Sequence, residues 1–265
     1  MIIIIFLFIL FTIIVFFNYQ FKIITYKKKI RVVMYHSIST NQFEDQITIT
    51  KKKFIEQLNY YKEKGYNTIN FTDIENGTIP PKALLITFDD GFLDNYQEAF
   101  PLLKEYGFKA VCFLVLGKLG KNMDWAGKYV VKERKLMTIQ QIKSCGPHIQ
   151  FAYHTYKHDN YEQLSLEEIK KDLELCTSVV QENNLSLFPA LSYTYGGYYR
   201  KKGKEQKAFF SLLKKYGINY AFRVGNRIAL FPFRNSMTIN RMDIRGYEDM
   251  NVFKKRIKWG RIKLM

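Results

Sequence analysis

The chain has 265 residues, of which 47% are hydrophobic and 16% aromatic, and its formal charge is +17. This composition excludes an intrinsically disordered protein and leaves room for one sizeable domain. The charge would suit nucleic acid, an anionic membrane or an acidic polymer, but the lysines are spread along the chain without an arginine-rich tract. A generally basic surface is therefore the favoured interpretation, and we expect no nucleic-acid partner.

The first element is an apolar N-terminal segment. Residues 2–17 are apolar apart from Thr12, and at ~1.5 Å per residue they reach the lower limit for crossing the hydrocarbon of a bilayer. No basic stretch precedes them and no small-residue cleavage site follows, which favours an uncleaved anchor over a removed signal. The sequence thus predicts a transmembrane anchor at 1–26 and one folded domain at 27–265.

Strand and helix patterns then alternate along the domain. Apolar residues recur at helical spacing between Thr50 and Gly65, and the continuous apolar run 83–88 suits a strand buried on both faces. Ser165 and Glu168 have the spacing of a capping box that opens a helix. Strands that alternate with helices imply parallel crossovers, and hence an α/β barrel.

The predicted elements are these, in chain order. Strands are expected at 31–35, 66–71, 83–88, 108–115, 149–153, 187–193, 220–224 and 237–241. Helices are expected after Thr50 and at about 93–106, 138–144, 165–182 and 205–216. The longest loops are expected at 117–127 and 226–236.

Two adjacent carboxylates, Asp89 and Asp90, directly follow the buried strand 83–88. Neighbouring side chains on a strand point in different directions, so one carboxylate could hold a metal while the other faces a substrate. Asp90-Gly91 alone would more often mark a turn. A histidine pair elsewhere in the chain favours the metal site.

That pair is His154 and His158, which follow the strand 149–153 and are four residues apart. One helical turn would place both imidazoles on the same side. With Asp90 they supply one carboxylate and two imidazoles for a divalent metal, and Asp89 is left beside them. This is the set of residues that a metal-assisted hydrolase needs.

Two segments resemble the first two motifs of the polysaccharide deacetylases, carbohydrate esterase family four: 87–91 (TFDDG) and 154–158 (HTYKH). Segment 33–37 (VMYHS) resembles the strand that opens members of the poly-N-acetylglucosamine deacetylase branch. Segment 191–197 (LSYTYGG) resembles the third motif of that branch, in which a proline usually stands where Thr194 is. The similarity covers nearly all of the chain after the predicted anchor.

The resemblance implies an irregular (β/α) barrel of the polysaccharide deacetylase type and a set of site roles. It implies that Asp90, His154 and His158 hold Zn²⁺, with Co²⁺, Ni²⁺ and Mn²⁺ as alternatives. Asp89 would be the general base that activates water toward an acetamide carbonyl. The metal and backbone N–H groups near Tyr195 would stabilise the oxyanion.

The chain departs from the family at the general acid. Many members supply a late histidine, but the corresponding region here is 238–242 (TINRM), and no histidine follows His158. His36 is the candidate acid, and the alternative is a core histidine at a strand end. Arg241, which we expect to follow a strand, would orient Asp89, contact the substrate, or simply form a salt bridge in the barrel.

Tyr193 and Tyr195 are the other expected substrate contacts, because aromatic rings stack against sugar faces; the alternative for each is packing. The whole pattern predicts a membrane-anchored enzyme that hydrolyses N-acetyl groups from the N-acetylglucosamine units of a cell-envelope or exported polysaccharide and releases acetate. The chemistry places the catalytic domain outside the cytoplasm, although the basic residues after the anchor favour the inside.

Alternatives of three classes remain open at this stage. The substrate could be peptidoglycan or chitin-like oligomers, or an O-acetylated xylan. The chain could instead be a non-catalytic glycan-binding relative, because the late histidine is missing and Thr194 is unusual. A binder of nucleic acid or another anionic polymer rests on the charge alone.

Overall fold

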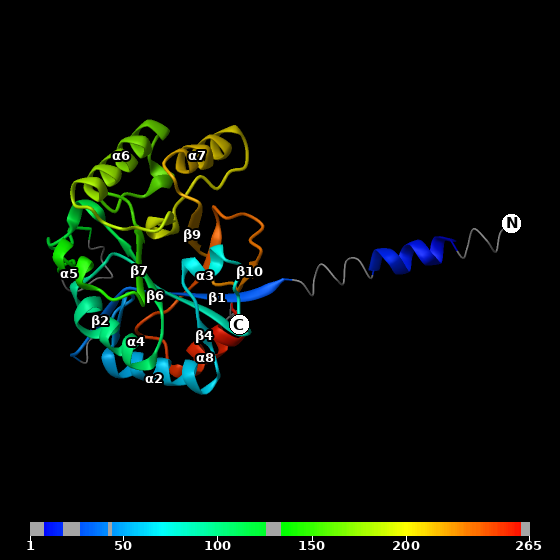
Figure 1. The fold of residues 1–265 in the computed structure, drawn as a ribbon, viewed down its shortest axis with the longest axis horizontal. Helices are drawn as coiled ribbons and strands as arrows, with labels where there is room; N and C mark the ends of the chain where they lie inside the picture. The colour runs from blue at the N-terminus through cyan, green and yellow to red at the C-terminus, as the bar shows by residue number, and fades with distance from the viewer. Residues whose placement is uncertain (1–7, 18–26, 42–43, 126–133, 261–265) are drawn as a thin grey trace.

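Seven parallel strands close into a barrel (Figure 1). The computed structural model describes residues 8–17, 27–41, 44–125 and 134–260. The strands follow one another around the barrel in the order β1 (Lys28–Tyr35), β5 (Ala83–Phe88), β6 (Ala110–Leu114), β7 (Ile149–Tyr153), β8 (Ala190–Ser192), β9 (Tyr220–Val224) and β11 (Ile239–Asp243). β1 pairs with β5 along one edge and with β11 along the other, and these pairings close the ring.

Four short strands lie outside this ring. β4 (Asn67–Thr68) is parallel to the first residues of β5, and β10 (Ala229–Phe231) is antiparallel to the first residues of β1. β2 (Ser37–Ser39) and β3 (Thr48–Thr50) form a separate parallel pair. β10 therefore covers β1 only at the N-terminal end of the barrel.

Helices surround the barrel (Figure 1). They are α2 (Lys51–Glu63), α3 (Phe71–Glu75), α4 (Phe100–Tyr106), α5 (Ile139–Ser144), α6 (Leu166–Glu182), α7 (Lys204–Lys215) and α8 (Met250–Trp259). A π-helical segment, η1 (Asn95–Ala99), leads into α4. The described residues also include the 3-10 segments η2 (Leu116–Lys118), η3 (Tyr161–Gln163) and η4 (Thr194–Gly196).

Side chains that alternate along the strands separate the interior of the barrel from its helical cover. Val32 of β1, Leu85 of β5 and Phe113 of β6 belong to one apolar cluster that has members on all seven barrel strands. Their neighbours Val33 and Ile86 belong to a second cluster, which includes residues of α2, α4 and α8. Because the period of a strand is two, the same alternation decides which polar residues face inward at the strand ends.

The predicted α/β barrel is confirmed, and the capping box of Ser165 opens α6 as expected. The strand predicted at 66–71 is wrong beyond β4. Asn70 accepts a hydrogen bond from the backbone of Asp73, whose side chain accepts one in return, so a helix begins at Phe71 instead. This second capping box was overlooked because the segment also alternates.

Other differences concern short elements that were not predicted and the position of Arg241. β10 falls within the loop predicted at 226–236, and β2, β3 and α8 were not expected. The last barrel strand is at Ile239–Asp243, so Arg241 lies within it and does not follow it. Strands of three residues are too short to show the alternation on which the predictions rest.

The predicted N-terminal anchor lies only partly within the described residues. Residues 8–17 are helical and their side chains are exposed. Across the described ranges, no helix is both long and apolar enough to span a bilayer. The rest of the segment predicted at 1–26, namely 1–7 and 18–26, lies outside the described residues.

Candidate metal centre

A polar layer closes the C-terminal end of the barrel. The inward positions after Leu85 are Thr87 in β5 and Asp89 directly after the strand, and the inward position after Ala190 in β8 is Ser192. The carboxyl ends of all seven strands meet at this end because the strands are parallel. Side chains from distant parts of the sequence are thus brought together here.

The turn after β5 separates the two adjacent carboxylates. Asp90 and Gly91 both have left-handed backbones, with φ of 72° and 78°. A Cβ at Gly91 would lie 2.6 Å from Leu114 Cδ2, so both the conformation and the close packing require glycine. The Asp-Gly turn and the metal site, which the sequence posed as alternatives, are therefore the same feature.

The two histidines come from a loop. His154 follows β7, and its backbone N–H donates to the carbonyl of Leu114 on β6 at 2.9 Å. Thr155 and His158 have positive φ values of 64° and 68°, so the segment is not the helical turn that the spacing suggested. The Thr155 hydroxyl accepts a hydrogen bond from His158 N at 3.0 Å, which fixes the loop.

Asp90, His154 and His158 converge on one point. Asp90 Oδ1 lies 3.3 Å from His154 Nε2 and 3.1 Å from His158 Nε2. One potential ligand atom from each residue lies within 4.8 Å of the others, and all three side chains are buried. The predicted ligand set is therefore assembled in space.

The hydrogen bonds around this trio fit a cation. His154 Nδ1 lies 2.8 Å from the carbonyl oxygen of Ser192, which can only accept, so Nδ1 carries a proton and Nε2, the nitrogen left for a metal, is turned toward Asp90. Asp90 Oδ1 is buried without a hydrogen-bond partner among the described residues. Lone pairs that face one another need a cation between them, and the N and O donors suit Zn²⁺ and similar ions.

The electrostatics of the three ligands differ. Although burial would lower it, the pKa of His154 is raised by the neighbouring charges of Asp89 and Asp90. Burial lowers the pKa of His158 and so favours the neutral imidazole. Although burial would raise it, the pKa of Asp90 is held below its usual value by His158 and His154. His158 is also held in place from two sides, because Trp125 stacks on it at 4.4 Å between ring centroids and the Tyr195 hydroxyl lies 3.1 Å from its Nδ1.

Asp89 is held by Arg241. The guanidinium donates to both carboxylate oxygens at 2.6 Å, and Ser192 Oγ donates to Asp89 Oδ2 at 3.1 Å. Burial alone would raise the pKa of Asp89, but the Arg241 charge keeps it below its usual value. Asp89 Oδ2 lies 3.9 Å from His154 Nε2, so an ionised carboxylate stands beside the metal ligands.

A cavity of about 430 Å³ opens over this layer. It is lined by His36 as well as by Asp89, Asp90 and both metal-site histidines. His36 Nδ1 is buried without a hydrogen-bond partner among the described residues, and Asn95 Nδ2 donates to the His36 backbone carbonyl at 2.6 Å. The structure thus places the candidate acid in the same cavity as the candidate base.

The two predicted aromatic contacts differ in accessibility. Tyr195 has 62% of its surface exposed at the cavity, whereas Tyr193 is buried and its hydroxyl donates to the Met237 carbonyl at 2.9 Å. Arg241 is fully buried, and its described hydrogen-bond partners are Asp89, Ser192 and Thr87. The predicted contacts of these residues with substrate stay predictions.

Ser192 is the site residue that sequence reasoning missed. Its carbonyl sets the tautomer of His154, and its hydroxyl bridges Arg241 and Asp89. The alternation of side chains along β8 could have identified it, because Ser192 is two residues after the inward-facing Ala190 and so faces the same side.

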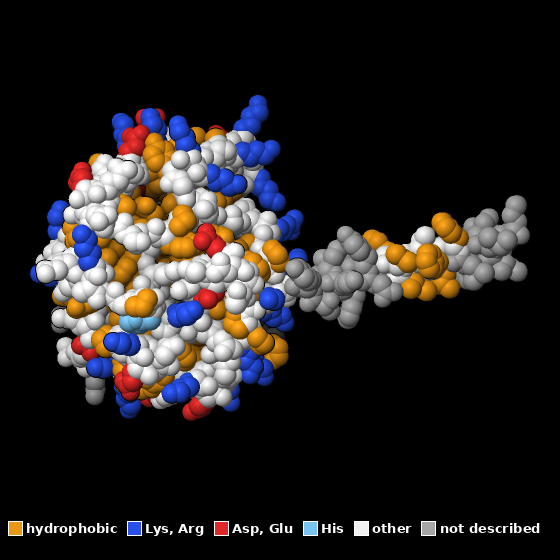
Figure 2. Space-filling model, in the orientation of Figure 1, with side chains coloured by type: hydrophobic (Ala, Val, Ile, Leu, Met, Phe, Trp, Pro, Cys, Tyr) orange, Lys and Arg blue, Asp and Glu red, His pale blue; other side chains and the backbone are white. Residues whose placement is uncertain are grey.

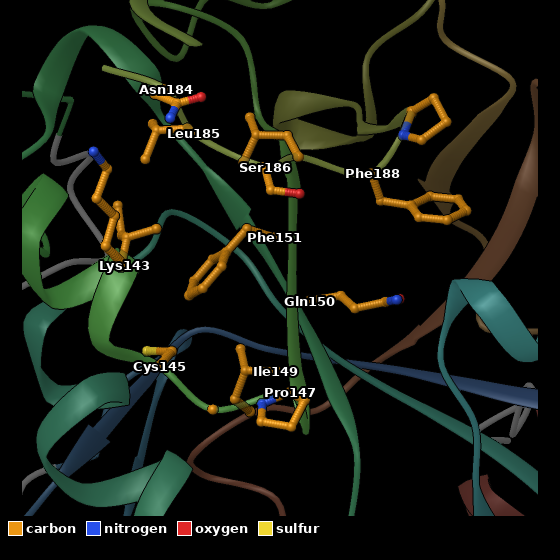
Figure 3. Close-up of a pocket in the computed structure, with 14 residues that line it drawn as sticks. Lys143, Cys145, Pro147, Ile149, Gln150, Phe151, Asn184, Leu185, Ser186 and Phe188 are labelled. Carbon is orange, nitrogen blue, oxygen red and sulfur yellow. The ribbon is translucent and has the colours of Figure 1, made fainter.

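A second cavity, of about 510 Å³, lies outside the barrel between α5, β7 and the segment that leads to β8 (Figure 3). Its described lining includes Lys143 and Cys145 but no carboxylate and no imidazole. Burial raises the pKa of the Cys145 thiol to about 11, which makes it a poor nucleophile. The predicted metal-assisted hydrolysis is therefore assigned to the cavity at the C-terminal end of the barrel, which contains the carboxylates and imidazoles.

The carboxyl of Asp94, just before η1, should make stability depend on pH. Burial raises the pKa of Asp94 to about 6, against the hydrogen bond that it accepts from Ser37 at 2.5 Å. The folded protein therefore binds this proton more tightly than the unfolded chain, and stability falls as the pH rises from about 4 to 6. Chemical denaturation of the wild type and of Asp94→Asn should show a difference in unfolding free energy that changes by about 2 kcal/mol between pH 4 and pH 7. An unchanged difference would refute the shift.

Comparison with known proteins agrees with this geometry. The family model described as polysaccharide deacetylase matches residues 76–209. A Bacillus subtilis protein described as a candidate polysaccharide deacetylase is 32% identical over 136 residues, which is 49% of this chain and 43% of the relative. A poly-beta-1,6-N-acetyl-D-glucosamine N-deacetylase of Staphylococcus aureus is 26% identical over 218 residues, which is 78% of this chain and 67% of the relative.

The fold is also that of a solved structure. A deacetylase of Streptococcus pyogenes, solved in complex with acetate, superimposes with a TM-score of 0.67 at 21% identity. The superposition covers 87% of this chain and 99% of the streptococcal one. The chain spans less than half of the Bacillus subtilis relative's length, so activity and substrate are argued from the site itself.

Proposed function

The chain belongs to the polysaccharide deacetylase family, and on this premise we propose that it removes N-acetyl groups from the N-acetylglucosamine units of a cell-envelope or exported polysaccharide. The observation that carries the proposal is the buried trio of Asp90, His154 and His158, with Asp89 held ionised beside it by Arg241. The name of the staphylococcal relative supports the choice of glycan.

The chain's own residues have distinct roles in this proposal. A divalent ion held by Asp90 and the two histidines would supply Lewis acidity toward the acetamide carbonyl. Asp89 takes a proton from the attacking water, because it is the ionised carboxylate that is not needed as a ligand. Arg241 keeps Asp89 charged and fixes its orientation through two hydrogen bonds.

His36 is proposed to donate the proton that the leaving amine needs. Its imidazole lines the cavity, and its buried Nδ1 has no described partner. Replacing His36 with alanine should lower kcat by about 10²-fold or more while the bound metal stays unchanged. The matched control is His148→Ala, since His148 bonds to the Phe100 carbonyl away from the cavity. Near-normal turnover of the His36 variant would exclude this role.

A panel of acetylated glycans with acetate detection tests the function. Acetate should be released from poly-N-acetylglucosamine, and more slowly or not at all from peptidoglycan and chitin oligomers. Release from acetylated xylan without release from any N-acetylated glycan would overturn the amide specificity. Binding of glycan by the metal-loaded protein without acetate release would support a non-catalytic relative.

We also propose that residues 1–26 anchor a catalytic domain, 27–265, outside the cytoplasm. The support is the apolar run 2–17 and the polymeric substrate, which an enzyme inside the cell would not reach. A reporter enzyme that works only outside the cytoplasm, fused to the C-terminus, should be active. A silent reporter on a stable fusion would place the domain inside.

A further inference from the structure

A groove of about 570 Å³ lies at the end of the barrel opposite the metal centre. It is formed where β1 begins and where the chain enters β5. Its described lining has no acidic residue and consists of Lys27, Lys28, Lys29, Arg31, Ile79, Pro80, Pro81 and Lys82. Five of these eight residues are cationic, so the groove concentrates positive charge.

The cations of this groove have no acidic partner among the described residues. Within the described part of the chain, none of the five forms an ion pair. Lys82 Nζ donates to the Lys64 carbonyl at 2.7 Å, and Arg31 Nε donates to the Ile257 carbonyl at 2.8 Å. These hydrogen bonds hold two of the charges in place while leaving their positive charge available to an anion.

Exposed apolar side chains flank the groove. Trp259, at the end of α8, is 70% exposed and lies two residues beyond the carbonyl that Arg31 contacts. Leu230 of β10 is 44% exposed and pairs with Lys29. Figure 2 shows Lys and Arg side chains along the side on which β1 begins. Cations beside an exposed indole and an aliphatic side chain are typical of a surface that meets lipid headgroups.

The position of the groove selects a bilayer over a soluble anion. Lys27 follows the apolar run 2–17 by ten residues, so the groove is close in the chain to the predicted anchor. The groove is lined by residues at the start of β1 and the cavity by Met34 near its end, so the two lie toward opposite ends of the strand. A flat anionic surface that covers the base would leave the cavity open at the other end of the barrel.

We propose that this base of the barrel docks on an anionic phospholipid surface. Phosphate groups of the lipid would occupy the groove between the lysines, and Trp259 would insert at the headgroup level. The proposal does not depend on the deacetylase activity. It has one consequence for that activity, because a cavity turned away from the bilayer would receive polymer strands and not sugars carried at the membrane surface.

The test uses the full chain reconstituted into vesicles with brominated lipids, which quench nearby indoles. The sequence has two tryptophans, so the signal of Trp259 is the difference between the wild type and Trp259→Phe. Quenching should be at least twofold greater in phosphatidylcholine vesicles that contain phosphatidylglycerol than in pure phosphatidylcholine. In high salt, quenching in the anionic vesicles should fall to the value measured in pure phosphatidylcholine.

A second experiment measures the same quenching after lysines of the groove are substituted. Lys28→Gln, Lys29→Gln and Lys82→Gln together should abolish the added quenching, and thermal unfolding should show that the variant is folded. The matched control removes three exposed lysines of another surface, Lys201, Lys214 and Lys215. This control should keep the wild-type quenching, because the effect is local and does not follow net charge.

Three results would overturn the proposal. Equal quenching in neutral and anionic vesicles would mean that the anchor alone holds the chain at the membrane. Equal loss in the groove and control variants would mean that net charge alone is responsible. Displacement by millimolar inorganic phosphate at constant ionic strength would identify a small-anion site. Acetate release measured in detergent separates each of these from a failure of the proposed function.

Discussion

Replacing Asp89 with asparagine should lower kcat for acetate release by about 10³-fold, since an amide cannot accept the proton of the attacking water. Metal content should stay close to the wild-type value, because the ligands are Asp90, His154 and His158. The loss should therefore appear in kcat with the ion still bound. Metal analysis and steady-state kinetics on the same preparation measure both.

Asp90→Ala is the matched comparison, since it alters the neighbouring carboxylate. It should lose the metal together with the activity, whereas Asp89→Asn should lose activity alone. Loss of metal in both variants, or turnover by Asp89→Asn near the wild-type rate, would contradict the division of roles between the two carboxylates.

Replacing Arg241 with methionine should have the largest effect on stability. Arg241 is fully buried, and its removal leaves the charge of Asp89 buried without two hydrogen bonds of 2.6 Å. Breaking such a pair costs about 3–5 kcal/mol of unfolding free energy. The pKa of Asp89 should rise, so the acid limb of the rate profile should move to higher pH.

Arg245→Met is the control for this variant. Arg245 also lines the cavity, but its ion pair with Asp243 is partly exposed, so its loss should cost no more than about 1 kcal/mol. Denaturation and pH–rate profiles of both variants measure the difference. Equal stability losses, or an acid limb that does not move for Arg241→Met, would show that Arg241 neither supports Asp89 nor tunes it.

Much of this site could be predicted from the sequence, because its residues directly follow strong strands. The apolar run 83–88 made β5 recognisable and hence placed Asp89 and Asp90 at a strand end. The strand before His154 did the same for the first histidine. In a parallel barrel all such ends meet, so local patterns were sufficient to bring the ligands together.

Other features depended on contacts between distant segments. His158 reaches Asp90 because Thr155 and His158 have left-handed backbones. A left-handed conformation at residues other than glycine cannot be predicted from the sequence pattern. The choice of Asp89 as the partner of Arg241 depends on the closure of the ring, in which β11 and β5 both pair with β1. Ser192 was missed because β8 has only three residues, too few for its alternation to stand out in the sequence.

The most direct test of the central claim is metal content and acetate release measured on one preparation before and after removal of metal by a chelator. The wild type should hold about one divalent ion per chain, lose acetate release from poly-N-acetylglucosamine when the ion is removed, and recover it with Zn²⁺. Unchanged acetate release from the metal-free chain, or none from the metal-loaded chain, would contradict the assignment of Asp90, His154 and His158 as the ligands of a hydrolytic metal.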